Sequence, residues 1–285
     1  MNVFFRFVIG LSLMVASLVV SAGSERVEWL FSGMVSSEKG NEYGYFFQVK
    51  KKANHYQALA TIVDSETNKV VFRGDGQADI DHALPNEWHV GAGFLSFNPI
   101  NDSWVFGFKS KGRQGFNFKV DTLHQSTQKP VFHALMPGVH LGINQASNLN
   151  GHIQLSEDAS EQFVTAKKTW FRYLTQDKTE LKVPPVSGVL CRFADGSGFY
   201  TVNLAEKNAA NAALAGWYDA QGNLVDMSQF VQISQTPDAL WHVNIPTPAH
   251  DITLPNASMQ KDVIFGFAEG YTPKGFCMLN ATIMR

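Results

Sequence analysis

SNLNGHIQLSEDASEQFVTAKKTWFRYL, residues 147–174, consists of two strand-like runs on either side of a polar turn at residues 156–160. The second run is long and ends in Trp170, Phe171 and Arg172, followed by two further apolar residues. The stretch lies between two parts of the chain that resemble each other. The connection between those two parts therefore passes through this stretch. The number and kind of domains follow from the two parts that flank it.

The flanking parts carry the same short motifs in the same order. Six blocks match at separations between 153 and 160 residues, for example Trp88 with Trp241 and Gly115 with Gly275. An ordered set of matches whose spacing drifts only in loops indicates an internal duplication. The matched blocks are residues 32–35 and 187–190, 44–46 and 198–200, 58–64 and 213–219, 68–70 and 223–225, 88–90 and 241–243, and 105–116 and 264–276.

Each copy has the pattern of an antiparallel β domain. Short runs rich in Val, Ile, Phe, Tyr and Thr recur between clusters of Gly, Asn, Asp and Pro, roughly eight runs in each copy. Eight strands suit a closed barrel that can enclose one small ligand, and a β-sandwich is the other arrangement. We therefore predict an all-β protein of two tandem antiparallel β-barrel domains, residues 23–182 and 183–285. Residues 124–182, which have no counterpart in the duplication, are predicted to add strands to the first domain and to form the seam.

The first 22 residues are predicted to be a signal peptide. Arg6 supplies a positive charge, residues 7–20 are almost wholly apolar, and Val20-Ser21-Ala22 is a small-residue cleavage site. The apolar run is shorter than the roughly 18 residues of a spanning helix. The mature chain is therefore expected to start at Gly23, which mass spectrometry can check, to lack an integral membrane span, and to be periplasmic or secreted. An uncleaved N-terminal anchor is the alternative.

Composition and motifs exclude several classes of function. The 285 residues carry a net charge of −2 and no block of basic residues, which argues against a nucleic-acid partner. The His residues are scattered, and no His-x-His, HExxH or Cys-x-x-Cys spacing occurs, so no metal site is predicted. No nucleotide-binding or nucleophile-elbow motif is present either, and no cofactor is predicted.

The two cysteines, Cys191 and Cys277, both fall in the second copy. Cys191 lies in its first predicted strand and Cys277 in its last, and these strands are neighbours in a simple closed barrel. We predict a disulfide that links them, because exported proteins can retain such bonds. Two buried free thiols are the alternative.

Trp170 and Arg172 are two residues apart and share a face if the run is a regular strand. If that face lines a cavity, Trp170 supplies a flat apolar wall and Arg172 a fork of donors for an anionic or carbonyl group. If it does not, Arg172 is expected to stack on Trp170 at the domain seam.

Several motifs spread over most of the mature chain match the pattern of one known family. They are Glu28-Trp29 with Gly33, Gly44-Tyr45-Phe46-Phe47-Gln48, residues 58–64, residues 150–152, residues 169–172, and residues 217–222. Together they resemble the AttH-like or hydroxyneurosporene synthase (carotenoid 1,2-hydratase) family of two-domain lipocalin-like (calycin) proteins. The resemblance implies two packed lipocalin-like barrels with an apolar ligand site. Enzymes of that family include hydratases of carotenoids and related isoprenoid and phenolic compounds, and fungal enzymes that guide pericyclic cyclisations.

One position departs from the family pattern. The family stretch commonly reads Trp-aromatic-Asp, and that Asp is the natural proton donor for hydrating an alkene, whereas Arg172 cannot act as an acid near neutral pH. We therefore predict a binder of a hydrophobic or amphipathic, lipid- or isoprenoid-like small molecule. The alternatives are a hydratase- or isomerase-like enzyme on a hydrophobic substrate, and a structural or interaction module of the cell envelope. No catalytic residue is assigned, and the candidate pocket residues are Trp170, Arg172, Gln48, Gln145, His152 and Trp29.

Overall fold

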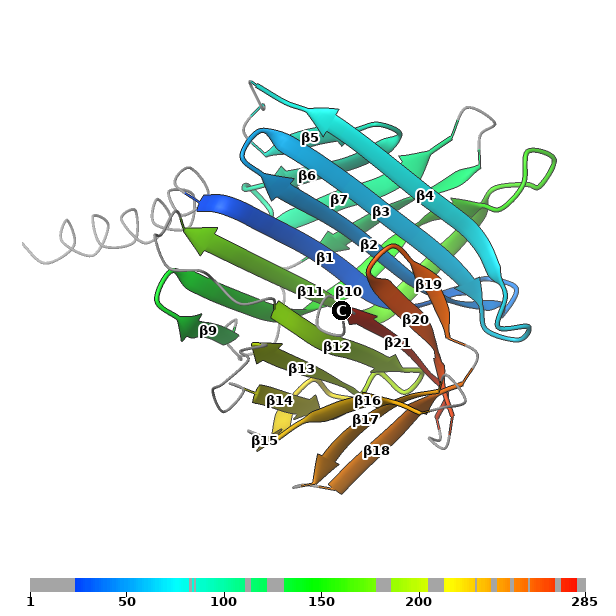
Figure 1. The fold of residues 1–285 in the computed structure, drawn as a ribbon. Helices are drawn as coiled ribbons and strands as arrows, with labels where there is room; N and C mark the ends of the chain where they lie inside the picture. Colours follow the sequence, from blue (N-terminus) through cyan, green and yellow to red (C-terminus); the bar gives the residue numbers. More distant parts are fainter. Residues whose placement is uncertain are drawn as a thin grey trace, which may run out of the picture.

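The computed structural model describes residues 24–81, 84, 86–110, 114–121, 131–177, 186–204, 213–228, 230–236, 240–246, 249–255, 257–269 and 273–280. All regular structure in these ranges is β-strand (Figure 1). Accordingly, none of the described ranges contains a helix with the length and apolar character that a membrane crossing requires. The predicted signal peptide and the predicted boundary between residues 182 and 183 lie outside the described residues, so export and the division into domains stay predictions.

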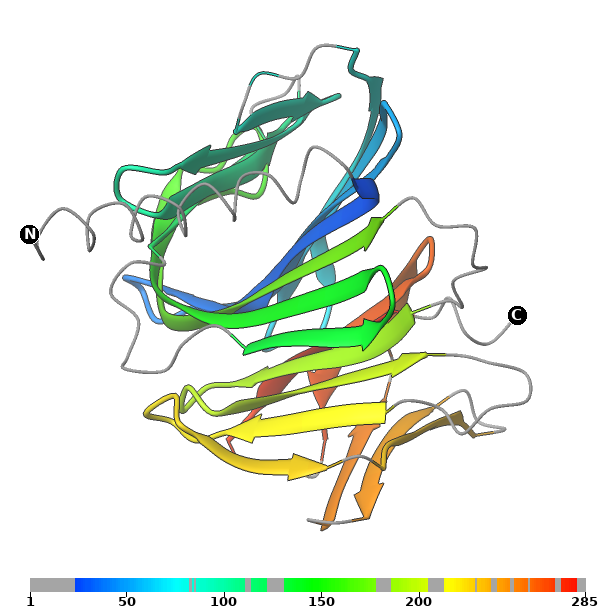
Figure 2. The same ribbon diagram turned by 90° about the vertical axis from the view of Figure 1, so that its left-hand side faces the viewer.

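The first unit is an eleven-stranded antiparallel sheet built from residues 24–177. Its strand order is β4-β3-β2-β1-β11-β10-β8-β7-β6-β5, and β9 pairs with β10. The sheet curls into a nearly closed barrel (Figure 2). The strands are β1 (Ser24–Ser37), β2 (Glu42–Lys52), β3 (His55–Asp64), β4 (Val70–Asp79), β5 (Glu87–Val90), β6 (Gly93–Asn98), β7 (Ser103–Lys109), β8 (Gly115–Asp121), β9 (Val131–Met136), β10 (Val139–Gln154) and β11 (Gln162–Asp177).

The second unit, residues 186–280, contains a seven-stranded and a three-stranded antiparallel sheet. The larger sheet has the order β15-β14-β13-β12-β21-β20-β19, and the smaller has the order β16-β17-β18. The strands are β12 (Val186–Phe193), β13 (Gly198–Leu204), β14 (Ala213–Tyr218), β15 (Leu224–Ser228), β16 (Gln232–Gln235), β17 (Trp241–Pro246), β18 (Ala249–Leu254), β19 (Ser258–Gln260), β20 (Val263–Ala268) and β21 (Gly275–Asn280).

The strand orders confirm the duplication and locate the insertion. The run β4-β3-β2-β1 of the first unit corresponds to β15-β14-β13-β12 of the second, and β8-β7 corresponds to β21-β20. In the second unit β12 pairs directly with β21. In the first unit β11 and β10 lie between β1 and β8. The segment without an internal copy therefore widens the first barrel, as its lack of a counterpart predicted.

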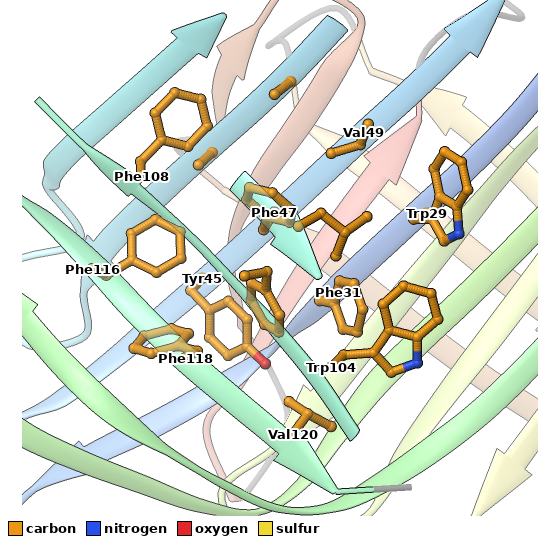
Figure 3. Packing of buried hydrophobic residues seen from close by; sticks show 14 of the residues in the cluster. Trp29, Phe31, Tyr45, Phe47, Val49, Trp104, Phe108, Phe116, Phe118 and Val120 are labelled. Atoms are coloured by element: carbon orange, nitrogen blue, oxygen red, sulfur yellow. The ribbon is translucent and has the colours of Figure 1, made fainter. Parts of the chain in front are cut away.

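The first barrel is filled by aromatic side chains from neighbouring strands (Figure 3). Phe31 stacks on Phe106 with ring centroids 4.2 Å apart, and Phe47 lies 5.1 Å from the same ring. Tyr45 meets Phe118 edge-on at 5.1 Å. Such pairs add roughly 0.5–1.5 kcal/mol each beyond the burial of their area. This interior is a packed core rather than an open ligand chamber.

Strand β1 is buried on both faces, which places it in the middle of the molecule. Trp29 and Phe31 alternate with Glu28 and Leu30, and all four are buried. Odd-numbered residues of β1 point into the barrel and even-numbered ones point away from it. The outward face is covered by the large sheet of the second unit (Figure 2).

We call the region where these two sheets meet the seam. Its apolar part consists of buried side chains from both units: Leu30, Met34, Phe46, Leu59, Val63, Leu141, Ile143, Trp170, Leu190, Tyr200, Val202, Tyr218, Val263, Phe265, Phe267, Phe276 and Met278. Ion pairs at its border also join the units, with Lys50 2.6 Å from Asp262 and Lys261 2.6 Å from Asp75. The two units are therefore held together by a continuous core of their own.

The structure places Cys191 and Cys277 in a disulfide. The two residues face each other directly in the pairing of β12 with β21, and their Cα atoms are 4.1 Å apart. Both side chains point into the second unit, on the side away from the seam. The bond therefore joins the first and last strands of the second unit at the place where the first unit has its two inserted strands.

Candidate functional site

Four of the six candidate pocket residues lie together on the seam, and two lie elsewhere. Trp170, Arg172, Gln48 and Gln145 are buried there on the outward faces of β11, β2 and β10. The other two are separated from this group and from each other. Trp29 points into the first barrel, 4.9 Å from the ring of Trp88, and His152 is exposed beside the ring of Phe163.

Trp170 and Arg172 share a face of β11, and that face belongs to the seam. Phe171 and Tyr173 point the other way, into the barrel. The alternation follows from the regular pairing with β1, in which Ser32 is opposite Trp170 and Leu30 is opposite Arg172. The wall formed by Trp170 therefore belongs to the contact between the two units.

Arg172 forms an ion pair with Glu28 rather than stacking on Trp170. Its Nη2 donates to Glu28 Oε1, and the guanidinium is only 2% exposed. Burial alone would raise the pKa of Glu28, but the charges of Arg172 and Lys50 outweigh it and lower that pKa. Glu28 is thus an anion at neutral pH. It binds the guanidinium of Arg172, which the sequence analysis predicted as a donor to a ligand.

The side chain that stacks on Trp170 is Arg192, from β12 of the second unit. Its guanidinium carbon lies 4.3 Å from the indole centroid. The indole Nε1 donates to the backbone oxygen of Cys191 over 2.6 Å. Tyr200 and Tyr218 approach the same indole edge-on, with ring centroids 6.0 and 5.5 Å away. Sequence analysis missed Arg192 and both tyrosines, because the residues next to them in the sequence do not indicate that they contact Trp170 of β11.

Arg192 is deeply buried, and no carboxylate of the described residues forms an ion pair with it. Its Nη1 donates to Gln145 Oε1 over 2.9 Å and to the backbone oxygen of Gly196 over 2.7 Å. Burial lowers the pKa of Arg192 to about 9, which leaves the side chain charged at neutral pH. Asp195 follows three residues later, but its carboxylate accepts hydrogen bonds from the amide and hydroxyl of Ser197.

His133 of β9 borders the same cluster. Its Nε2 lies 3.2 Å from the hydroxyl of Tyr200, and the imidazole is half-buried. Burial lowers the pKa of His133 and raises the pKa of Tyr200, so both groups are neutral near pH 7. His140, two residues into β10, is exposed and near Asp177 instead, so the two histidines do not form one site.

Several buried polar atoms at the seam have no hydrogen-bond partner among the described residues. They include Ser32 Oγ, Nε2 and Oε1 of Gln48, Gln145 Nε2, Arg172 Nε, and both Nε and Nη2 of Arg192. Buried polar groups are normally paired, so a group of unpaired ones calls for water or a ligand. The described residues contain no cluster of His, Cys, Asp and Glu side chains suited to a metal ion. The arrangement is therefore one of neutral aromatic surfaces with donors at their edges.

Solved structures with the same fold are found among AttH-like proteins and hydratases. A protein from Nitrosomonas europaea that carries the provisional name AttH matches with a TM-score of 0.63 and 11% identity, over 91% of this chain and 93% of that one. Kievitone hydratase from Nectria haematococca matches with a TM-score of 0.56 and 9% identity, over 88% and 87% of the two chains. CghA, solved with Sch210972, matches with a TM-score of 0.53 and 11% identity, over 90% and 87%.

No family model matches the chain, and no curated protein matches its sequence. The structural likeness covers both units, so it confirms the expected two-barrel, lipocalin-like fold of AttH-like proteins. Identities of 9–11% show the fold alone, and the chemistry has to be argued from the side chains of this chain.

Proposed function

We propose that this protein binds a hydrophobic or amphipathic small molecule at the seam, against Trp170 and its neighbours. The observation that carries the proposal is the group of unpaired buried donors beside the Trp170, Tyr200 and Tyr218 rings. Small-molecule sites are mostly apolar surfaces with a few placed polar groups, and this cluster has that composition. Half-buried His133 and Lys168 lie at the border of this cluster.

The barrel interiors are less suited to a ligand. In the first unit, stacked rings fill the space between the strands, as Phe31, Phe47 and Phe106 illustrate. In the second unit the space between its two sheets is filled by apolar side chains and the disulfide. The unpaired buried donors of Arg192 and Gln145 lie at the seam instead.

Replacing Trp170 with phenylalanine is expected to weaken binding of the neutral fluorophore N-phenyl-1-naphthylamine by about tenfold or more. The change removes part of the flat wall and the indole N–H that holds it against β12, and a tenfold change corresponds to about 1.4 kcal/mol. Fluorescence titration of the purified protein measures the affinity and the stoichiometry. Circular dichroism confirms that each variant is folded.

Trp29→Phe is the matched control, because Trp29 is equally buried but points into the first barrel. Binding at the seam leaves the affinity of this variant within about twofold of the parent. If Trp29→Phe abolishes binding and Trp170→Phe does not, the ligand lies in the barrel. If no apolar probe binds the parent protein, the proposed function is wrong.

The contact between His133 and Tyr200 favours a second candidate, a hydratase- or isomerase-like activity at the same place. A neutral imidazole can take up a proton and a phenol can deliver one, and the two groups are 3.2 Å apart. Burial lowers the pKa of His133, so the imidazole remains a competent base to lower pH than an exposed histidine. Arg172 takes no part in this chemistry because its charge is paired with Glu28.

His133→Asn is expected to abolish turnover while preserving affinity for the fluorophore. General acid–base catalysis typically contributes 10²–10⁴-fold to a rate, so a loss of about 10²-fold or more is expected. Isoprenoid and phenolic alkenes incubated in ¹⁸O-labelled water, followed by mass spectrometry, would reveal hydration as a labelled product. Equal rates for the parent and the variant would show that the imidazole of His133 has no role in catalysis. His140→Asn, which alters an exposed histidine, is the control.

A further inference from the structure

Two cations, Arg192 and Lys168, are near enough at one end of the seam to interact electrostatically. Burial lowers the pKa of Lys168, the charge of Arg192 lowers it further, and the charge of Asp219 opposes the shift only in part. Lys168 donates to the backbone oxygen of Gln221 over 3.0 Å and is half-buried. Like charges repel each other, so the arrangement costs free energy to the extent that negative groups do not offset it.

Among the described residues, no carboxylate forms an ion pair with Arg192, and the charge of Asp195 acts on it only from beyond that contact. The ion pairs in the described ranges do not include Arg192, whereas Arg172, buried to the same extent, is paired with Glu28. Nε and Nη2 of Arg192 have no partner, and neither does Nε2 of Gln145, whose Oε1 already accepts from Nη1. A buried charge without a partner destabilises a protein, so such charges are normally compensated.

The donors are also rigidly held, as a binding site requires. The guanidinium is stacked on Trp170 at 4.3 Å and tied to Gly196 O at 2.7 Å, so its plane and its free edge are set before any ligand arrives. Gly198 permits this packing, because a Cβ there would lie 3.1 Å from both Arg192 Nη1 and the Trp170 ring. A planar fork of two N–H donors matches the two oxygens of a carboxylate.

We propose that Arg192, with Gln145 and Lys168, forms the carboxylate-binding end of the seam site, so that the ligand class is an apolar, ring- or chain-bearing carboxylic acid. The inference rests on the proposed function, because it names the polar end of the same ligand. The carboxylate accepts from Nε and Nη2 of Arg192 and from Nε2 of Gln145, and its charge offsets the repulsion between Arg192 and Lys168. The apolar body lies against the aromatic rings around Trp170.

The test compares 1-pyrenebutyric acid with its uncharged methyl ester, two fluorophores with the same apolar body. Titration of the parent protein is expected to show at least tenfold tighter binding of the acid. Arg192→Gln is expected to remove this preference by weakening the acid tenfold or more while leaving the ester within about twofold. Lys168→Met, at a half-exposed position where misfolding is not expected, should reduce the preference about threefold. Lys119→Gln, a surface cation on β8, should leave it unchanged.

The outcomes separate the carboxylate end from the apolar site. If acid and ester bind the parent protein equally well, the carboxylate assignment is wrong while the apolar site stands. If Arg192→Gln weakens both probes equally, the guanidinium only supports the packing of Trp170, and the assignment is again wrong. If neither probe binds, both the apolar site and its carboxylate end are refuted. Loss of folding in Arg192→Gln leaves the parent comparison and Lys168→Met to decide the outcome.

Discussion

Replacing Glu28 with glutamine is expected to lower the free energy of unfolding by about 3–5 kcal/mol, because it leaves the Arg172 charge buried without a partner. The side chain keeps its size and loses only its charge, so the effect reports the electrostatics of the seam rather than a cavity. The Arg172 side chain is only 2% exposed. Urea denaturation followed by circular dichroism measures the change.

The double variant Glu28→Leu/Arg172→Met is expected to be much closer to the parent in stability than Glu28→Gln. Two apolar side chains of similar volume remove both charges, and such replacements are often neutral or stabilising. Asp121→Asn is the control at an exposed pair, where Lys119 lies 3.3 Å away, and it should change stability by less than about 1 kcal/mol. A double variant that is less stable than Glu28→Gln would contradict the account.

The pH dependence of stability follows from the same pair. The pKa of Glu28 is lowered in the folded state from its ordinary value of 4.5, so the stability it contributes is fully present above that value. This contribution is lost as the pH falls through the lower pKa of the folded state. Between pH 5 and the acid transition, the parent protein is therefore expected to lose more stability than Glu28→Gln, in which this position does not titrate.

Removing the disulfide is expected to destabilise the protein by about 2–4 kcal/mol, through the variant Cys191→Ala/Cys277→Ala. The bond closes a long loop, since its cysteines are 86 residues apart, and long loops retain the most entropy in the unfolded chain. Thermal unfolding of parent and variant measures the loss. Because the bond lies in the second unit, on the side away from the seam, binding of N-phenyl-1-naphthylamine at the seam should survive in the variant at low temperature.

Thiol titration in denaturant without reductant provides the control. The parent protein should show no reactive thiol before reduction and two after it. Two reactive thiols before reduction would mean that the cysteines are free in the isolated protein and would contradict the structure. Equal stability of the parent with and without reductant would show that the bond contributes nothing.

Local patterns were sufficient for the fold class and for the duplication. Repeated blocks such as those around Trp88 and Trp241 recur in both units because each copy folds by the same pairing of consecutive strands. Period-two alternation also placed Trp170 and Arg172 on one face, since successive side chains in a strand point to opposite sides. The positions of Cys191 and Cys277 in the first and last strands predicted their proximity for the same reason.

Local patterns could not say which face of a doubly buried strand is the barrel interior. On β1, Trp29 and Leu30 are both apolar and both buried, so alternation alone assigns neither to the seam. This ambiguity explains why Trp29 and Trp170 were grouped as pocket residues although they lie on opposite sides of the sheet. The exposed position of His152 was missed because nothing nearby in sequence reports what covers its face of β10.

The amino-acid sequence thus determines the strands, their order within each copy and the alternation of side chains, because these depend on neighbours a few residues apart and on the repeated motifs. The partners at the seam were decided only by the tertiary structure. Glu28 meets Arg172 across 144 residues of chain, and His133 meets Tyr200 across 67. The first pair forms when β1 and β11 become neighbours in one sheet, and the second forms when the two units pack against each other. The free energy that selects such contacts is the burial of both surfaces, which no single strand encodes.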